Sequence, residues 1–134
     1  MKLLLDTHII LWALTDDARL SAKAKDIILS SEDEIFYSVA TIWEISIKHM
    51  QHPEHMSVSG RQLAAYCQAA GYHSLPVKNE HVYAVETLKR RPDSPRHNDP
   101  FDRIMLAQAK AENMYFLSHD TLLTDYQEKC LLNV

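Results

Sequence analysis

Short apolar runs alternate with helical patterns along this chain, and this alternation constrains the fold more than any other feature. Residues 2–5 predict a buried strand, and residues 7–14 predict a helix that begins almost at once. The same change of period recurs at 34–38 followed by 39–50, and at 114–118 followed by a short helix within 120–126. Strands that alternate with helices pair in parallel. The sequence therefore predicts an α/β fold with a central parallel sheet and helices on both faces.

The remaining segments fit the same plan. Helices are expected at 21–31, 61–71, 79–91 and 100–113, and strands at 72–77 and 131–134. Gly71 marks the end of one helix, and Asn79 is the expected cap of the next. With 134 residues, of which 46% are hydrophobic, the chain suits a single domain over 1–134.

Composition excludes several classes of protein. Every apolar run falls well short of the roughly 18 residues that a membrane span needs, and the N-terminus lacks a signal-peptide pattern, so a cytoplasmic protein without a membrane partner is expected. A net charge of −4 argues against coating nucleic acid by bulk positive charge. Cys67 and Cys130 have no metal-site spacing and are expected to be free thiols.

Acidic residues stand where predicted strands end and helices begin. Asp6 follows the first strand, Asp120 follows the strand at 114–118, Asp102 opens a helix, and Glu44 lies early in the helix at 39–50. Each position also has a structural explanation. An Asp before a helix caps its free N–H groups, Asp99 with the following proline has that form, and the spacing from Thr41 to Glu44 is that of a capping box.

Capping does not explain why the acids gather at one edge of one sheet. In an α/β protein that edge, beyond the carboxyl ends of the strands, is the expected site. Clustered carboxylates repel one another unless a cation neutralises them. Oxygen ligands of this kind suit Mg²⁺ or Mn²⁺, which favour phosphate substrates.

Four segments resemble the motif regions of the PIN domain family, and in particular of its VapC-type toxins. They are LLLDTHIILWAL (3–14), ATIWEISIK (40–48), NDPFDRIMLAQA (98–109) and LSHDTLLTDY (117–126). The resemblance implies an α/β/α sandwich with a central parallel sheet. It also implies a Mg²⁺- or Mn²⁺-dependent endoribonuclease, the toxin of a toxin–antitoxin pair, which forms a homodimer and is inhibited by a cognate antitoxin. The catalytic and metal-binding acids of the family fall on Asp6, Glu44, Asp102 and Asp120, and Asp99 matches an additional acid.

The implied reaction is hydrolysis of an RNA backbone by a water whose pKa the cation lowers. Thr7 and Ser118 are expected to orient the carboxylates or waters, or to act as helix or strand caps. His8 and His119 can face the site, although packing over the sheet is the favoured alternative. Relatives often carry Arg where this chain has Asn98, which weakens one expected phosphate contact. Basic residues near the acids are the candidates for RNA binding, with ordinary solvated charge as the alternative: Lys48, Arg91, Arg96 and Arg103.

Other interpretations remain open. A zinc site at His49, His52 and His55 is disfavoured by the intervening proline. A haloacid-dehalogenase-type phosphatase needs an acid two residues after Asp6, where this chain has a histidine. A non-catalytic binding module, or a PIN nuclease outside a toxin–antitoxin system, would use the same surface. An antitoxin helix is expected to lie in an apolar groove, with the residues around Ile9, Trp12 and Ile42 as candidates. Burial of these side chains in the core is the alternative, and for Ile9 it is the favoured one.

Overall fold

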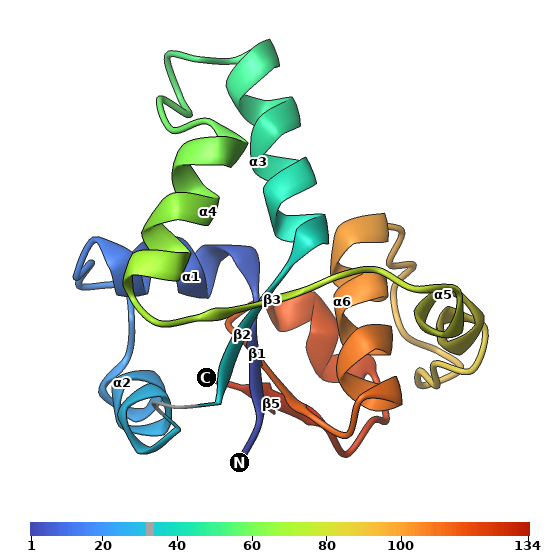
Figure 1. Ribbon diagram of the computed structural model, residues 1–134. Helices are drawn as coiled ribbons and strands as arrows, with labels where there is room; N and C mark the ends of the chain where they lie inside the picture. The colour runs from blue at the N-terminus through green and yellow to red at the C-terminus, as the bar shows by residue number, and fades with distance from the viewer. Residues whose placement is uncertain (32–33) are drawn as a thin grey trace.

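A five-stranded parallel sheet forms the centre of the computed structural model, which describes residues 1–31 and 34–134 (Figure 1). Within the described residues the strand order is β3-β2-β1-β4-β5, and every neighbouring pair is parallel. The strands are β1 (Leu3–Leu5), β2 (Ile35–Ser38), β3 (His73–Leu75), β4 (Tyr115–Ser118) and β5 (Leu131–Asn133). The helices are α1 (Thr7–Leu14), α2 (Ala22–Ser30), α3 (Val39–Gln51), α4 (Gly60–Ala69), α5 (Asn79–Val85) and α6 (Pro100–Ala111), with a 3₁₀ helix, η1, at Thr121–Asp125. The predicted α/β/α architecture is confirmed.

Strand β1 occupies the middle of the sheet because all three of its leucines are buried. Leu3 and Leu5 join one hydrophobic cluster, and Leu4 joins another on the opposite face. A continuous apolar run is the pattern of a strand covered on both sides. Each fully buried leucine contributes about 1.5–3 kcal/mol relative to exposure, so burial fixes the strand that ends at Asp6.

The two clusters define the layers. Residues of α1, α2 and α4 pack on the face that carries Leu3 and Leu5, and α6 packs on the face that carries Leu4. Helices α3 and α4 contact each other and stand together beyond the carboxyl end of the sheet (Figure 1). They approach closely at Gly60, where an added Cβ would overlap Ser46 Oγ and lie 2.9 Å from the Ile42 carbonyl oxygen. This contact positions the helix that carries Glu44.

Local predictions succeed at most helix starts and fail at two. Asp6, Asp99 and Asp120 all cap the helices that follow them. Helix α3 is capped by Ser38, whose hydroxyl accepts the Ala40 N–H, so the predicted capping box from Thr41 is wrong. Both residues of that spacing lie inside the helix and face the site instead.

The helix expected at 79–91 is shorter than predicted. It ends at Val85, and its capping position is Lys78, where we expected Asn79. The segment after it bonds to the C-terminal part of the chain: the Gln127 N–H donates to the Lys89 carbonyl (2.7 Å), and the Arg91 N–H donates to the Asp125 carbonyl (3.0 Å). These distant hydrogen bonds replace the last turns of the expected helix.

Two predicted absences can be compared with the structure. Cys67 and Cys130 are free thiols, as predicted. Among the described residues, every helix is too short or too polar to cross a bilayer.

Candidate active site

Asp6 lies at the carboxyl end of the central strand and is 4% exposed. Its Oδ1 accepts the Thr7 N–H at 2.7 Å, and its Oδ2 accepts the Ser118 hydroxyl at 2.7 Å. Ser118 ends the neighbouring strand β4, so the pairing of β1 with β4 brings this donor to the carboxylate. The expectation that Ser118 orients an acid is confirmed. Both Asp6 oxygens are fixed, and each retains a lone pair for a further contact.

Glu44 approaches the same edge from α3 and is 9% exposed. Its Oε1 accepts the Thr7 hydroxyl at 2.7 Å, and its Oε2 lies 3.2 Å from Lys48 Nζ. The Thr7 Oγ1 also contacts Thr41 Oγ1 at 2.9 Å. Residues 7, 41 and 44 therefore form one hydrogen-bonded group that ties α3 to the end of β1, as expected for Thr7.

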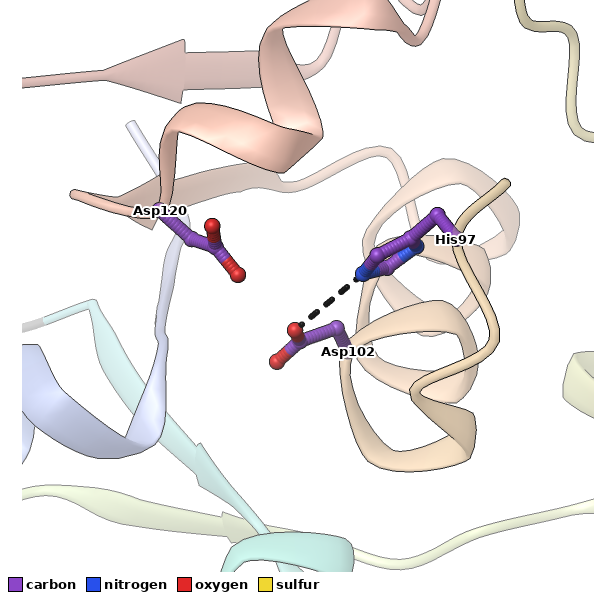
Figure 2. Close-up of side chains that lie close together, drawn as sticks. All are labelled: His97, Asp102 and Asp120. Atoms are coloured by element: carbon purple, nitrogen blue, oxygen red, sulfur yellow. Dashed lines mark ion pairs between the residues drawn. The ribbon is translucent and has the colours of Figure 1, made fainter. Parts of the chain in front are cut away.

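Three side chains converge on one space beside α6 (Figure 2). They are His97 from the loop before α6, Asp102 from its first turn, and Asp120 from the turn after β4. One nitrogen or oxygen of each lies within 4.8 Å of the others. His97 Nε2 lies 3.4 Å from Asp102 Oδ2, an ion pair when the imidazole is protonated. His97 and Asp102 are near one another in the sequence, and the fold brings Asp120 to them from the turn after β4.

The carboxylates strongly influence one another. The pKa of Asp102 is raised to about 9, mainly by burial and further by the charges of Asp6, Asp99 and Asp120. Burial also raises the pKa of Asp6, with a smaller upward contribution from the charge of Glu44, against its hydrogen bonds from Ser118 and Thr7. Each of the five predicted acids therefore lies within electrostatic reach of Asp6 or Asp102. Without a cation, the native site retains protons that free aspartates release.

His97 is the residue that the sequence analysis missed. It is 6% exposed, and its Nδ1 lies 2.9 Å from the Tyr126 hydroxyl. Its Nε2 is buried, and no described residue forms a hydrogen bond with it. Burial lowers the pKa of His97, with Arg90 and Arg103 acting in the same direction against Asp120 and Asp99, so the neutral imidazole is favoured. Its position two residues before Asp99 was the only available signal.

The site meets the requirements of a divalent cation. A buried imidazole nitrogen to which no described residue makes a hydrogen bond faces two carboxylates, and a divalent cation can be bound by all three at once. The Tyr126 hydroxyl fixes the ring by its other nitrogen, as outer partners of metal-binding histidines do. Asp99 has a different position: it is exposed, and its Oδ1 accepts the Phe101 and Asp102 N–H groups at 2.9 and 3.3 Å.

The predicted basic residues do not form one patch. Lys48 pairs with Glu44. Arg103 lies half-buried on α6, and no described residue forms a hydrogen bond with its Nε. Arg91 and Arg96 are exposed on the loop before α6, and the Arg96 Nε donates to Asn98 Oδ1 at 3.2 Å. Only Lys48 and Arg103 lie on elements that also carry an acid of the site.

Two alternative sites lose support. His49 Nδ1 contacts the Met56 carbonyl at 2.9 Å, while the exposed His52 and His55 lie near Glu54, and no metal group involving them occurs in the described part of the chain.

The groove expected around Ile9, Trp12 and Ile42 does not include Ile9, for which core burial was the favoured expectation and is confirmed. Ile9 is 1% exposed and belongs to the core, and Ile42 packs against the same cluster. A separate apolar groove of about 530 Å³ lies between α3, α5 and α6, with Val39, Val82 and Phe101 in its wall.

Comparisons with known proteins agree with this architecture. VapBC2 from Rickettsia felis, bound to a DNA fragment from the VapBC2 promoter, matches with a TM-score of 0.69 and 13% identity, over 99% of this chain and 98% of that chain. DNA-bound VapBC from Salmonella typhimurium matches with a TM-score of 0.69 and 11% identity, over 99% of this chain and 98% of that chain. A toxin–antitoxin complex from Klebsiella pneumoniae matches with a TM-score of 0.62 and 13% identity, over 98% of this chain and 97% of that chain. At these identities the likeness concerns the fold.

The sequence itself places the protein in a family. No curated protein matches the chain. The family model of the PIN domain, in contrast, matches residues 3–129, which include all the acids described above. The chain belongs to the PIN domain family.

Proposed function

We propose that the protein is a divalent-metal-dependent endoribonuclease that acts as the toxin of a toxin–antitoxin pair. The observation that carries the nuclease proposal is the convergence of buried acids at the carboxyl edge of the sheet, where burial and mutual repulsion raise the pKa of Asp6 and Asp102. Such a group binds protons or cations, and Mg²⁺ or Mn²⁺ in turn binds phosphate oxygens. Membership of the PIN domain family supports a nuclease.

In this proposal Asp6, Asp102 and Asp120 would hold the cation, with His97 beside the last two and Glu44 near Asp6. When bound, a divalent cation would supply a water of lowered pKa and offset charge on the phosphate oxygens. The protein's own groups do the positioning. Ser118 and the Thr7 N–H fix the Asp6 oxygens, and the Thr7 hydroxyl fixes Glu44. The exposed Asp99 acts through its charge and its helix cap.

The basic residues have different expected roles in RNA binding. Lys48 pairs with Glu44 in the metal-free protein. Because its side chain is 44% exposed, its ammonium group can contact a phosphate instead when Glu44 faces a bound cation. Arg91 and Arg96 on the exposed loop can hold the strand at a distance from the cut. Arg103 contacts the phenol of Tyr126, which bonds to His97, so it supports the site from behind.

Addition of millimolar Mg²⁺ or Mn²⁺ to chelator-treated protein is expected to raise the melting temperature. An ion that binds only the native state at 100 times its Kd contributes about 2.7 kcal/mol, which corresponds to a rise of several degrees. A nitrogen ligand favours Mn²⁺ over Mg²⁺, so the Mn²⁺ shift is expected to be larger and to shrink in His97→Gln. Differential scanning fluorimetry measures both shifts, and His55→Gln is the matched control on an exposed histidine.

A melting temperature that does not change with either ion would contradict the proposed metal site and favour a non-catalytic binding module. Equal Mg²⁺ and Mn²⁺ shifts that do not change in His97→Gln would limit the site to the carboxylates. Electron spin-echo spectroscopy of bound Mn²⁺ provides a readout independent of stability, because a coordinating His97 nitrogen adds its own nuclear coupling.

The partner proposal has a different basis. The similar structures are complexes of toxins with antitoxins, two of them on DNA. We expect this chain to form a homodimer and to be inhibited by a small protein encoded beside it, and co-expression of that protein is expected to relieve the growth arrest that the chain causes. An active, toxic enzyme that no adjacent gene product inhibits would instead be a PIN nuclease outside a toxin–antitoxin system.

A further inference from the structure

A hollow of about 500 Å³ opens directly beside the acids, on the side away from α6. Asp6 and Asp120 form one end of it. The remaining wall consists mainly of flat side chains from α1, from the loop after α1 and from the turn after β4: His8, Trp12, Arg19 and His119. The mechanism above leaves these four residues without a role. The hollow is therefore continuous with the proposed cleavage site and chemically different from it.

The flat groups are arranged around the indole of Trp12. The His8 ring lies 5.8 Å from it, centroid to centroid, at an interplanar angle of 32°. The His119 ring meets it edge-on at 5.4 Å and 70°. The guanidinium carbon of Arg19 lies over the indole, 5.3 Å from its centroid. Such a cluster presents several π faces and edges within one small space.

Contacts within the protein hold these groups in place. Arg19 donates from Nε to Asp17 Oδ1 at 3.1 Å and from Nη2 to Oδ2 at 2.8 Å, a two-point pairing that fixes the plane of the guanidinium. This pairing lowers the pKa of Asp17 to about 2. The His119 Nδ1 bonds to the Val134 carbonyl. Trp12 packs against the core from α1. The wall is formed before a ligand arrives, which reduces the entropic cost of binding.

We propose that this hollow binds a nucleobase of the RNA strand, next to the phosphate that the acids hold through their cation. The proposal rests on the proposed nuclease function and adds a subsite to it. Single-stranded RNA is bound by stacking its unpaired bases on aromatic rings and arginine planes. A base and its own phosphate are joined through one sugar, so a hollow that borders Asp6 and Asp120 is where the base of a bound nucleotide falls.

Charge favours a base over the side chain of a protein partner. An arginine from a partner would seek the carboxylates and the face of Trp12, but Arg19 already lies over that indole, and its side chain is 70% exposed. A second cation would meet this charge at the entrance. A neutral base meets no such repulsion, and the Arg19 plane stacks on it as well.

The first test removes the base from the substrate. An RNA that the wild type cuts at one position is prepared with an abasic residue on either side of the cut, and kcat/KM is compared with that for the intact RNA. Loss of the stacked base is expected to lower wild-type kcat/KM about tenfold or more. The ratio of kcat/KM for the intact RNA to kcat/KM for the abasic RNA is expected to fall toward one in Trp12→Leu. The same is expected in Arg19→Lys, which keeps the charge of the side chain but not its planar group.

Two further variants complete this comparison. Trp12→Phe keeps a ring and is expected to retain most of the ratio, whereas a merely structural role for Trp12 gives no such rescue. Tyr83→Leu, an exposed aromatic residue on α5, is the control with an unchanged ratio. A wild-type ratio near one at both positions, or an unchanged ratio in both Trp12→Leu and Arg19→Lys, overturns the proposal.

The second test needs no cleavage. The chain has two tryptophans, so Trp43→Phe leaves Trp12 as the only one. With Mg²⁺ present, adenosine monophosphate is expected to quench Trp12 fluorescence, whereas ribose 5-phosphate and an arginine-containing tripeptide are not. Absence of quenching by the nucleotide overturns the subsite, and quenching by the peptide alone assigns the hollow to a protein partner. If the wild type cuts no RNA, the nuclease proposal fails, and this titration still decides the subsite.

Discussion

Asp6→Asn is expected to fold like the wild type and to cleave RNA about a thousandfold more slowly, or not measurably. The amide keeps the shape of the side chain, and its oxygen still accepts the Thr7 N–H. The amide nitrogen can no longer accept the Ser118 hydroxyl, but the change also removes one charge from a buried carboxylate whose pKa burial raises, and the two effects on the metal-free fold oppose each other. The substitution removes the acid at the end of the central strand, where the other acids of the site converge. A gel assay on labelled RNA, with circular dichroism of the same sample, measures both effects.

The matched control is Asp26→Asn, the same substitution on the exposed surface of α2. It is expected to cleave at the wild-type rate. Full activity in a folded Asp6→Asn protein would show that Asp6 is only a helix cap.

Asp102→Asn is expected to make the metal-free protein more stable at alkaline pH, although it removes a residue of the site. The pKa of Asp102 is raised from 3.8 to about 9, so the native state holds a proton that the unfolded chain releases. Stability from this group is therefore present at low pH and is lost as the pH rises toward 9, by at most about 1.4 kcal/mol per pH unit. The asparagine carries no charge at any pH and avoids this loss.

Thermal melts between pH 6.5 and 8.5 in chelator measure the effect. The wild type is expected to lose several degrees across this range, and Asp102→Asn to change less and melt higher at pH 8.5. Excess Mn²⁺ is expected to reverse the order, because only the wild type regains stability from the ion. A metal-free wild type that becomes more stable over this range would contradict the raised pKa.

The order of elements was predictable because the relevant signals are local. Three leucines in a row, buried on both faces, identify β1, and Asp6, Asp99 and Asp120 act as the predicted caps. The end of α5 was not predictable, because hydrogen bonds to residues some 35 positions away decide it. The helix propensity of residues 86–91 contains no information about hydrogen-bond partners so far along the chain.

The same distinction applies to the site. The acids stand beside strand ends, so strand pairing alone brings Asp6 and Asp120 to one edge. His97 stands in a loop with no periodicity, and its position depends on the Tyr126 hydroxyl and on the first turn of α6. Core burial was the favoured expectation for Ile9, and the packing of α1 against the sheet confirms it.

Cleavage of single-stranded RNA by chelator-treated protein tests the central claim most directly. The account predicts no cleavage in chelator, cleavage restored by Mn²⁺ or Mg²⁺, and none in Asp6→Asn under the same conditions. It also predicts products without a 2′,3′-cyclic phosphate, because water and not the neighbouring 2′-hydroxyl attacks the phosphorus. Cleavage that persists in chelator, that survives in Asp6→Asn, or that leaves cyclic phosphate ends would contradict it.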